Sequence, residues 1–163
     1  MKIFKKTSLI IISSALILTS TVSARTFRDT RGHWAEASID FITDKKLMSG
    51  YQDGTFKPNE NMSRAEFYAT VNSLAGYDKT YTVTFSDVST SDWFYNDVAK
   101  GIKAGYITPT TGRLNPNREI TREEVAEILG YVYSLSPREA STNEFGDRAR
   151  ISPSARGYVG ALV

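Results

Sequence analysis

Apolar residues recur at helical spacing on both sides of a polar, turn-rich loop. Before the loop they stand at Trp34, Ala35, Ile39, Ile42 and Leu47, and after it at Phe67, Val71 and Leu74. A stripe with this spacing is typical of an amphipathic α-helix. The loop carries Gly50, Asp53-Gly54 and Pro58, which favour turns and extended backbone over helix. The pattern therefore predicts a helix–loop–helix unit.

A second stretch of the chain has the same order of elements. Its first helix is marked by Phe94, Val98 and Ile102, with Asp92 as the expected cap, and its second by Val125, Ile128, Leu129 and Val132. Ser63 with Glu66, and Thr121 with Glu124, each fit a capping box, in which two side chains satisfy backbone N–H groups at a helix start. Gly76 and Gly105 are placed to end helices.

The two stretches are copies of one motif. Phe27-x-Asp29, Trp34, Gly54, Pro58-Asn59 and Arg64-x-Glu66 recur as Phe85-x-Asp87, Trp93, Gly112, Pro116-Asn117 and Arg122-x-Glu124. The copies are 58 residues apart, or 59 at the tryptophan. A fixed period of this size indicates stacked supersecondary units with a shared core. We expect one repeat at 27–76 and a second at 85–135, with polar linkers at 77–84 and 136–144.

A third copy opens at Phe145-x-Asp147 and is expected to cover 145–163. Its apolar positions, Ile151, Ala155, Val159 and Leu162, predict a first helix only. Two interpretations fit this truncated repeat: the chain is a fragment of a longer protein, or the last helix takes its packing from elsewhere.

Residues 1–24 have the pattern of a secretory signal peptide. Lys2, Lys5 and Lys6 precede an apolar run from Leu9 to Leu18, and a small-residue cleavage site ends at Ala24. The alternative is a membrane anchor, but the run is shorter than the roughly 20 residues that span a bilayer. We expect export, cleavage after Ala24 and no membrane contact afterwards.

Composition then limits the classes of function. The chain has 20 Lys+Arg and 18 Asp+Glu, and removing the three signal lysines leaves 17 basic residues against 18 acidic ones. This balance does not favour a nucleic-acid partner, which needs a basic patch. There is no cysteine, so stability must come from a hydrophobic core and thiolate chemistry is excluded.

Two arginines are the main candidates for binding. Arg64 and Arg122 each stand at the first helical position after a cap, where unpaired N–H groups and the helix dipole favour an anion. A guanidinium there can pair with a carboxylate through two parallel hydrogen bonds. The alternative is a structural arginine that ties the helix start to Asp29 or Asp87.

The other candidates have structural alternatives that weigh more than the binding interpretation. Trp34 and Trp93 suit stacking on a sugar, but a tryptophan that opens an amphipathic helix usually belongs to the core. Asp29 and Asp87 are expected to cap or make turns before they contact a ligand. Gly54 and Gly112 are expected to supply turn geometry, with close approach of a ligand as the second interpretation.

Metal and catalytic chemistry find little support. A calcium loop that began at Asp53 would put Arg64 at the twelfth position, where a bidentate Glu is required. The chain has one histidine, His33, and no marked nucleophile with its base. We therefore expect no metal, no cofactor and no catalysis in this segment. A small secreted glycosidase is the enzymatic alternative.

The repeated motifs resemble the S-layer homology (SLH) domain. Residues 50–58 read Gly-Tyr-Gln-Asp-Gly-Thr-Phe-Lys-Pro and residues 63–66 read Ser-Arg-Ala-Glu, after the Phe-x-Asp and tryptophan elements. The resemblance covers about 27 to 163. It implies a mainly α fold of tandem helix–loop–helix SLH repeats in a pseudo-three-fold helical bundle, with grooves between neighbouring repeats and the third repeat truncated.

The resemblance also implies a function, a partner and a location. SLH grooves bind secondary cell-wall polysaccharide, often through a pyruvylated, anionic sugar, and the family's arginine maps to Arg64 and Arg122. We expect a secreted protein of the cell wall or S-layer that anchors an exported protein without covalent bonds. The alternative is a protein–protein module that assembles with other envelope proteins.

Three positions depart from the family pattern. Glu123 stands where alanine is usual, Pro109 stands where the first repeat has Gly50, and Ser154 replaces the tryptophan of the third copy. The third copy has no arginine motif, so at most one groove between complete repeats is expected in this chain.

Overall fold

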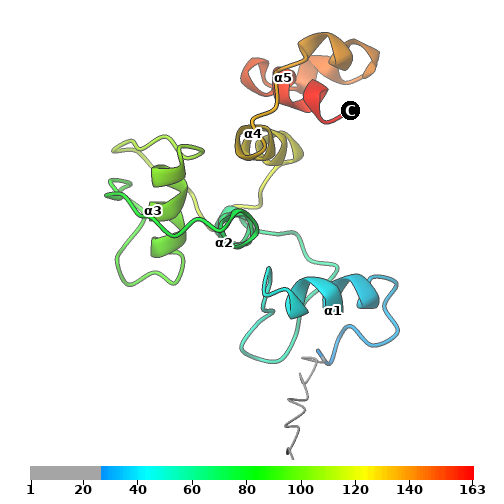
Figure 1. The fold of residues 1–163 in the computed structure, drawn as a ribbon, viewed down its shortest axis with the longest axis vertical. Helices are drawn as coiled ribbons and strands as arrows, with labels where there is room; N and C mark the ends of the chain where they lie inside the picture. The colour runs from blue at the N-terminus through cyan, green and yellow to red at the C-terminus, as the bar shows by residue number, and fades with distance from the viewer. Residues whose placement is uncertain (1–26) are drawn as a thin grey trace, which may run out of the picture.

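The computed structural model describes residues 27–163, and the predicted signal peptide at 1–24 lies outside the described residues. Regular structure in the described part is helical, which confirms the mainly α prediction; extended segments pair only at an isolated bridge between Ser63 and Glu119. The α-helices are α1 (Glu36–Asp44), α2 (Arg64–Ala75), α3 (Tyr95–Ala104), α4 (Arg122–Val132) and α5 (Pro153–Ala161), and the 3₁₀-helices are η1 (Glu139–Glu144) and η2 (Arg148–Arg150). Figure 1 shows them strung along an open, elongated chain.

Local sequence signals set the ends of the repeat helices. Both capping boxes are present, at Ser63 before α2 and at Thr121 before α4. Gly76 ends α2 with φ 68° and Gly105 ends α3 with φ 95°, a left-handed conformation that glycine adopts without steric cost. The cap expected at Asp92 is wrong, because its carboxylate accepts the Ser89 N–H and α3 begins three residues later.

The main core joins the two complete repeats. Helix α2 of the first repeat packs against α3 of the second, and Tyr68 and Val71 share one buried cluster with Val98 and Ile102. Asn72 is buried with them and donates to both the carbonyl and the carboxylate of Asp97, at 3.0 Å each. The helices that pack together are therefore the second helix of one repeat and the first helix of the next, so the packing is offset by half a repeat from the sequence motif.

The same offset recurs at the C-terminal end. Helix α5 of the third copy packs on α4 of the second repeat and on η1. The linker expected at 136–144 is wrong in its second half, because η1 is folded there and Thr142 is fully buried. Close approach is possible because Gly160 has no side chain: a Cβ there would lie 2.0 Å from the Arg138 carbonyl oxygen.

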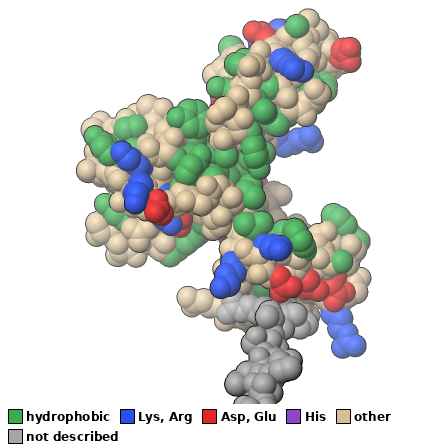
Figure 2. All heavy atoms as spheres, in the orientation of Figure 1, with side chains coloured by type: hydrophobic (Ala, Val, Ile, Leu, Met, Phe, Trp, Pro, Cys, Tyr) green, Lys and Arg blue, Asp and Glu red, His purple; other side chains and the backbone are tan. Residues whose placement is uncertain are grey.

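The N-terminal end has a smaller apolar cluster around the first loop. Phe27 is buried, its ring lies 5.3 Å from that of Phe56, and Ile39 of α1 is buried as well. Helices α2 and α4, the second helices of the two complete repeats, lie between α1 and α5 in Figure 1. Figure 2 shows hydrophobic side chains gathered between α3 and α4, with charges of both signs in small groups elsewhere on that face.

Candidate functional site

Arg64 connects the first repeat to the second. Its Nη1 lies 2.8 Å from Oε1 of Glu124, and its Nε donates to the Tyr68 hydroxyl at 3.0 Å. Both side chains of the ion pair are 21% exposed. The structural alternative for Arg64 is thus correct in kind but wrong in partner, because the carboxylate comes from Glu124 and not from Asp29 or Asp87.

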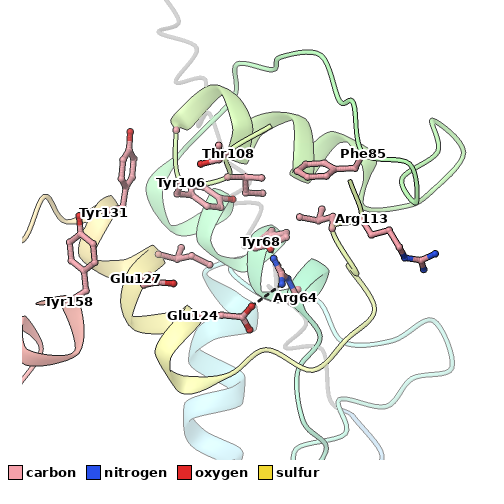
Figure 3. Close-up of a pocket in the computed structure, with 14 residues that line it drawn as sticks. Arg64, Tyr68, Phe85, Tyr106, Thr108, Arg113, Glu124, Glu127, Tyr131 and Tyr158 are labelled. Carbon is pink, nitrogen blue, oxygen red and sulfur yellow. Dashed lines mark hydrogen bonds and ion pairs between the residues drawn. The ribbon is translucent and has the colours of Figure 1, made fainter. Parts of the chain in front are cut away.

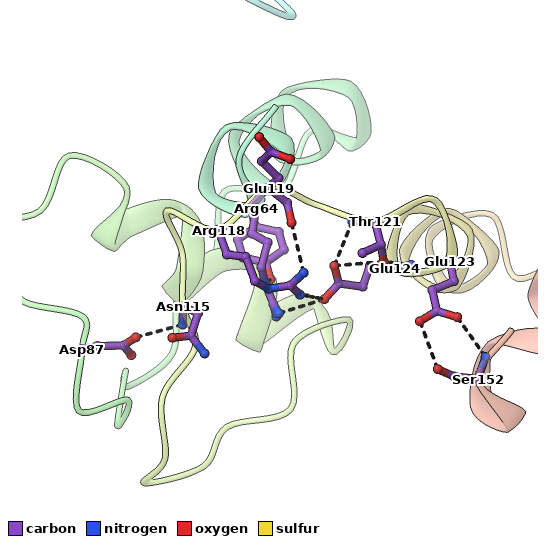
Figure 4. A network of polar contacts seen from close by, with 10 residues as sticks. Arg64, Asp87, Asn115, Arg118, Glu119, Thr121, Glu123, Glu124 and Ser152 are labelled. Carbon is purple, nitrogen blue, oxygen red and sulfur yellow. Dashed lines mark hydrogen bonds and ion pairs between the residues drawn. The ribbon is translucent and has the colours of Figure 1, made fainter. Parts of the chain in front are cut away.

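Glu124 holds three groups at once, as Figure 4 shows. Its Oε1 also accepts from Arg118 at 2.5 Å, and its Oε2 accepts the backbone N–H of Thr121 at 3.0 Å in the capping box. Burial alone would raise the pKa of Glu124, but the Thr121 hydrogen bond and the charges of Arg64 and Arg118 outweigh it and lower that pKa. The carboxylate therefore stays ionised and carries the inter-repeat contact.

The backbone at the start of α2 is occupied as well. The N–H of Arg64 donates to the carbonyl of Arg118 and the N–H of Ala65 to the carbonyl of Pro116, both at 2.9 Å. These are N–H groups that a helix start leaves without an intrahelical partner. The first of the two anion sites expected from the sequence is therefore filled by the second repeat.

Arg122, at the start of α4, is in a different state. Its side chain is exposed and makes no hydrogen bond or ion pair with any residue of 27–163. Next to it, Glu123 accepts the backbone N–H of Ser152 at 2.9 Å and its hydroxyl at 3.0 Å. The acid that departs from the family pattern thus caps α5, and Arg122 stays open to solvent.

Asp29 and Asp87 hold the loops of their repeats. Asp29 accepts the backbone N–H groups of Phe56 and Lys57 at 2.9 and 2.7 Å, and Asp87 accepts those of Leu114 and Asn115 at 2.8 Å each. Burial acts to raise both pKa values, but these hydrogen bonds outweigh it and lower them. Each aspartate therefore fixes a loop that lies 27 or 28 residues ahead in the sequence. This role is structural, as expected, but it is neither helix capping nor the formation of a local turn.

The prediction that the tryptophans belong to the core is wrong. Trp34 is 89% exposed and Trp93 is 63% exposed. Both stand before the first helical residue, because α1 is capped by Ala35 and α3 by Phe94. In the second repeat the buried Phe94 takes the core position next to Trp93. Both indole rings face solvent and remain candidates for sugar contact.

The two glycines of the loops are not equivalent. Gly54 has φ 81°, which fulfils its expected role in a turn, but Gly112 is not in the left-handed region. The second loop is shorter, and Thr110 closes it by accepting the Gly112 N–H at 3.2 Å. The two glycines share one contact: the Gly54 carbonyl accepts the N–H of Arg28, and the Gly112 carbonyl accepts the N–H of Ser86.

A pocket of about 400 Å³ lies between the repeats beside the Arg64–Glu124 pair (Figure 3). Residues from both complete repeats and from the third copy line it: Arg64 and Tyr68 from α2, Tyr106 and Arg113 from the second loop region, Glu124, Glu127 and Tyr131 from α4, and Tyr158 from α5. Of the residues expected to bind glycan, only Arg64 lines this pocket. Asp29, Asp87, the tryptophans, the two loop glycines and Arg122 lie outside it.

Residues 27–163 contain neither a cluster of metal ligands nor a helix fit to cross a membrane. In this part of the chain, no three or more His, Cys, Asp or Glu side chains come together in a way that could hold a metal ion. None of the described helices combines the length and the apolar character needed to cross a bilayer.

Two helix–loop–helix repeats, each with an arginine at the start of a capped second helix, define a helical repeat module, and comparison with known proteins identifies its family. The profile of the S-layer homology domain matches residues 26–67 and 84–126, together more than half of the 163 residues. The chain belongs to the S-layer homology domain family. The domains of this family are non-catalytic anchoring domains of S-layer and cell-surface proteins.

The relatives are much longer proteins. The chain is 34% identical to an amylopullulanase of Thermoanaerobacterium thermosulfurigenes over 83% of its own length and 8% of the relative's. It is 38% identical to a cellulosome-anchoring protein of Acetivibrio thermocellus over 77% of its length and 30% of the relative's. A surface-layer 125 kDa protein of Lysinibacillus sphaericus is 26% identical over 96% of the chain and 13% of the relative. The chain therefore spans well under two thirds of each, and the enzyme name applies to a protein that lies mostly outside the match.

Proposed function

We propose that this chain anchors an exported protein to the bacterial cell envelope by binding an anionic, pyruvylated secondary cell-wall polysaccharide, and that Arg122 makes the main ionic contact. Family membership and the relative named as a cellulosome-anchoring protein support the anchoring part. The matched segment is a small share of the relatives, which supports a module that is joined to a separate cargo.

One observation carries the choice of Arg122. Its counterpart Arg64, at the same position of the first repeat, binds a carboxylate, that of Glu124, at 2.8 Å. The first repeat thus provides an internal example of the ligand chemistry that suits this position. In the described part of the chain no carboxylate reaches Arg122, so its guanidinium fork is available to a carboxylate from outside. Arg64 is a second contact only when Glu124 is displaced.

The aspartates, glycines and tryptophans expected in the site contribute to binding without making the ionic contact. Asp29 and Asp87 hold their loops in shape, and Gly54 allows the chain to turn in the first loop, while Gly112 is held by Thr110 in the second. The exposed rings of Trp34 and Trp93 present flat apolar surfaces to a sugar. In this proposal these residues position or stack on the glycan and do not pair with its charge.

The test is binding of purified wall polysaccharide to the wild type, Arg122→Ala and Arg64→Ala. A charge-assisted hydrogen bond contributes about 1.5–3 kcal/mol, so Arg122→Ala is expected to weaken binding at least tenfold and to reduce its salt dependence. Arg31→Ala is the matched control, because Arg31 is exposed and has no partner among the described residues. Equal affinity of wild type and Arg122→Ala would remove Arg122 from the site.

A protein–protein assembly module is the second candidate, and exposed aromatic side chains at the N-terminal end favour it. Trp34, just before α1, and Phe41, on α1, are both largely exposed. Sedimentation with intact wall sacculi and with sacculi stripped of polysaccharide separates the candidates. Retention on stripped walls that is lost in a Phe41→Ser variant would support assembly with an envelope protein and contradict the glycan.

A further inference from the structure

The first helices of the two complete repeats differ in charge at equivalent positions. From the tryptophan through these helices the copies are 59 residues apart, so Asp44 of α1 corresponds to Lys103 of α3, and Phe41 corresponds to Lys100. Within its bounds α1 carries acidic residues and no basic one, whereas α3 carries two lysines and one aspartate. The same motif therefore forms an acidic helix with an aromatic residue in one copy and a basic helix in the next.

Helix α1 exposes an aromatic ring beside an acidic edge. Phe41 is 60% exposed. On one side of it, Asp40 and Asp44 lie one turn apart, and their carboxylates make no hydrogen bond or ion pair with any residue of 27–163. Glu36, one turn earlier on the same edge, is held by a backbone N–H before the helix. On the other side, the Lys45 ammonium lies over the Phe41 ring, 5.7 Å from its centroid.

A second pocket, of about 220 Å³, lies where α2 ends beside α3, and its rim is basic. The side chains that line it include Lys79, Lys100, Lys103, Tyr77 and Ala104. Two of the lysines have an acidic neighbour: Asp78 is 3.4 Å from the Lys79 ammonium and Asp97 is 3.7 Å from that of Lys100. Lys103 is exposed and has no such neighbour in the described part of the chain. The rim therefore keeps a net positive charge.

The exposed ring and this pocket match in size and in charge. An apolar cavity of about 150 Å³ holds a benzene ring, so a pocket of about 220 Å³ has room for the Phe41 side chain. The stems of the lysines and the Tyr77 ring offer apolar surface to it. Asp40 and Asp44 beside the ring would then meet the lysines of the rim. Figure 1 shows α1 and α3 in separate parts of the molecule, so the ring does not reach the pocket of its own chain.

We propose that Phe41 of one copy of this chain enters the Lys79–Lys100–Lys103 pocket of a second copy, where Asp40 and Asp44 pair with the lysines. The contact joins two different surfaces. It therefore closes when two copies exchange it reciprocally or when several form a ring, and it otherwise continues from copy to copy. Neither surface includes Arg122, so the inference is independent of the proposed function.

The first test is sedimentation velocity over a range of concentrations, with the chain that remains after removal of residues 1–24. The mass is expected to rise above that of the monomer with concentration and to fall again with added salt, which screens exposed ion pairs. Phe41→Ser is expected to require at least tenfold more protein for the same association, as for loss of an aromatic anchor. Tyr133→Ser is the matched control, because Tyr133 is 57% exposed and does not line the pocket.

Charge reversal identifies the partner surface. Asp44→Lys and Lys103→Asp are each expected to weaken association about tenfold, because like charges then meet. An equimolar mixture of the two variants is expected to restore it, since the α1 of each variant finds on the other a pocket of opposite charge. Glu144→Lys, at an exposed position without partners in the described range, is the control for the change in net charge. All these side chains are exposed, so each variant should melt like the wild type.

Four results would overturn the proposal. The first two are a wild type that stays monomeric at every concentration and a mixture of the charge variants that does not associate. Dimers that Lys103→Asp leaves intact would assign Phe41 to a contact with another α1. Retention of a monomeric wild type on stripped walls through Phe41 would assign it to an envelope protein.

Two variants separate this proposal from the proposed function. Arg122→Ala is expected to associate like the wild type. Phe41→Ser is expected to bind short acidic oligosaccharides of the wall polysaccharide as the wild type does. Each proposal can therefore fail while the other stands.

Discussion

The guanidinium of Arg64 and the carboxylate of Glu124 stand 60 residues apart in the sequence and 2.8 Å apart in space. Each belongs to the same motif, Arg-x-Glu after a capping residue, in successive repeats. The glutamate caps its own helix and also receives the arginine of the preceding copy. A single short motif therefore starts a helix and joins that helix to the neighbouring repeat.

This pair predicts a measurable coupling in stability. Arg64→Ala, Glu124→Gln and the double variant form a cycle in which Gln keeps the capping geometry and removes the charge. We expect a coupling free energy of about 1 kcal/mol from chemical denaturation, since the pair is mostly shielded from water. The exposed pair Lys79–Asp78 serves as a control and is expected to give a coupling near zero. A null result for both pairs would mean that the inter-repeat contact adds nothing to stability.

Glu124 also predicts how stability depends on pH. Its pKa is lowered in the folded chain from the ordinary value of 4.5, so the unfolded chain binds the proton more readily. Its contribution is therefore complete above pH 4.5 and is lost as the pH falls below 4.5 through the folded pKa. Denaturation midpoints measured from pH 7 to pH 3 are expected to fall less steeply for Glu124→Gln than for the wild type. Parallel curves would contradict the assignment.

Asp87 predicts a cost from loss of loop support. Its carboxylate accepts two backbone N–H groups, at Leu114 and Asn115, and Leu114 is buried in the core cluster. Asp87→Ala leaves these donors unpaired and is expected to lower the free energy of unfolding by about 1–3 kcal/mol. Asp147 is the matched control, because this aspartate of the third copy is exposed and its side chain holds no loop among the described residues. An equal effect of both substitutions would exclude the loop-holding role.

The parts of the fold that were predicted correctly depend on near neighbours in the sequence. Ser63 with Glu66, Thr121 with Glu124, and Gly76 after α2 act within one helical turn, so their residue types suffice. The same holds for Gly54, whose turn needs a positive φ. The mainly α class followed from these local signals and from the apolar stripes.

The site required information that a linear pattern does not contain. Asp87 binds a loop 27 residues away and Arg64 a carboxylate 60 residues away, and nothing in the spacing distinguishes these partners from others of the same charge. Tyr131 and Tyr158 were missed because each looks like an ordinary helix residue. The glycines opposite them, Gly105 and Gly130, are the only local sign of close packing.

The tryptophans predict a separation of binding from stability. Trp34 is exposed. Within residues 27–163, the one aromatic ring that pairs with it is that of His33, and the two ring centroids are 5.5 Å apart. Trp34→Ala is expected to change the free energy of unfolding by less than about 0.5 kcal/mol, as is usual for exposed positions. Phe94→Ala, at a buried position, is expected to cost about 3–5 kcal/mol. A large loss of stability in Trp34→Ala would show that its ring packs in a way that the fold does not reveal.

Glu123 predicts a local effect at the C-terminal end. Its carboxylate accepts the N–H and hydroxyl of Ser152 from the neighbouring repeat, at a helix start that has no side-chain cap of its own. Glu123→Ala therefore removes the cap of α5, a loss of about 1 kcal/mol, and speeds amide exchange at 153–161 while exchange in α2 and α3 is unchanged. Glu60→Ala, on an exposed ion pair of the first repeat, should leave exchange in α5 as it is. Unchanged exchange at 153–161 would mean that packing on α4 and η1 holds α5 without this cap.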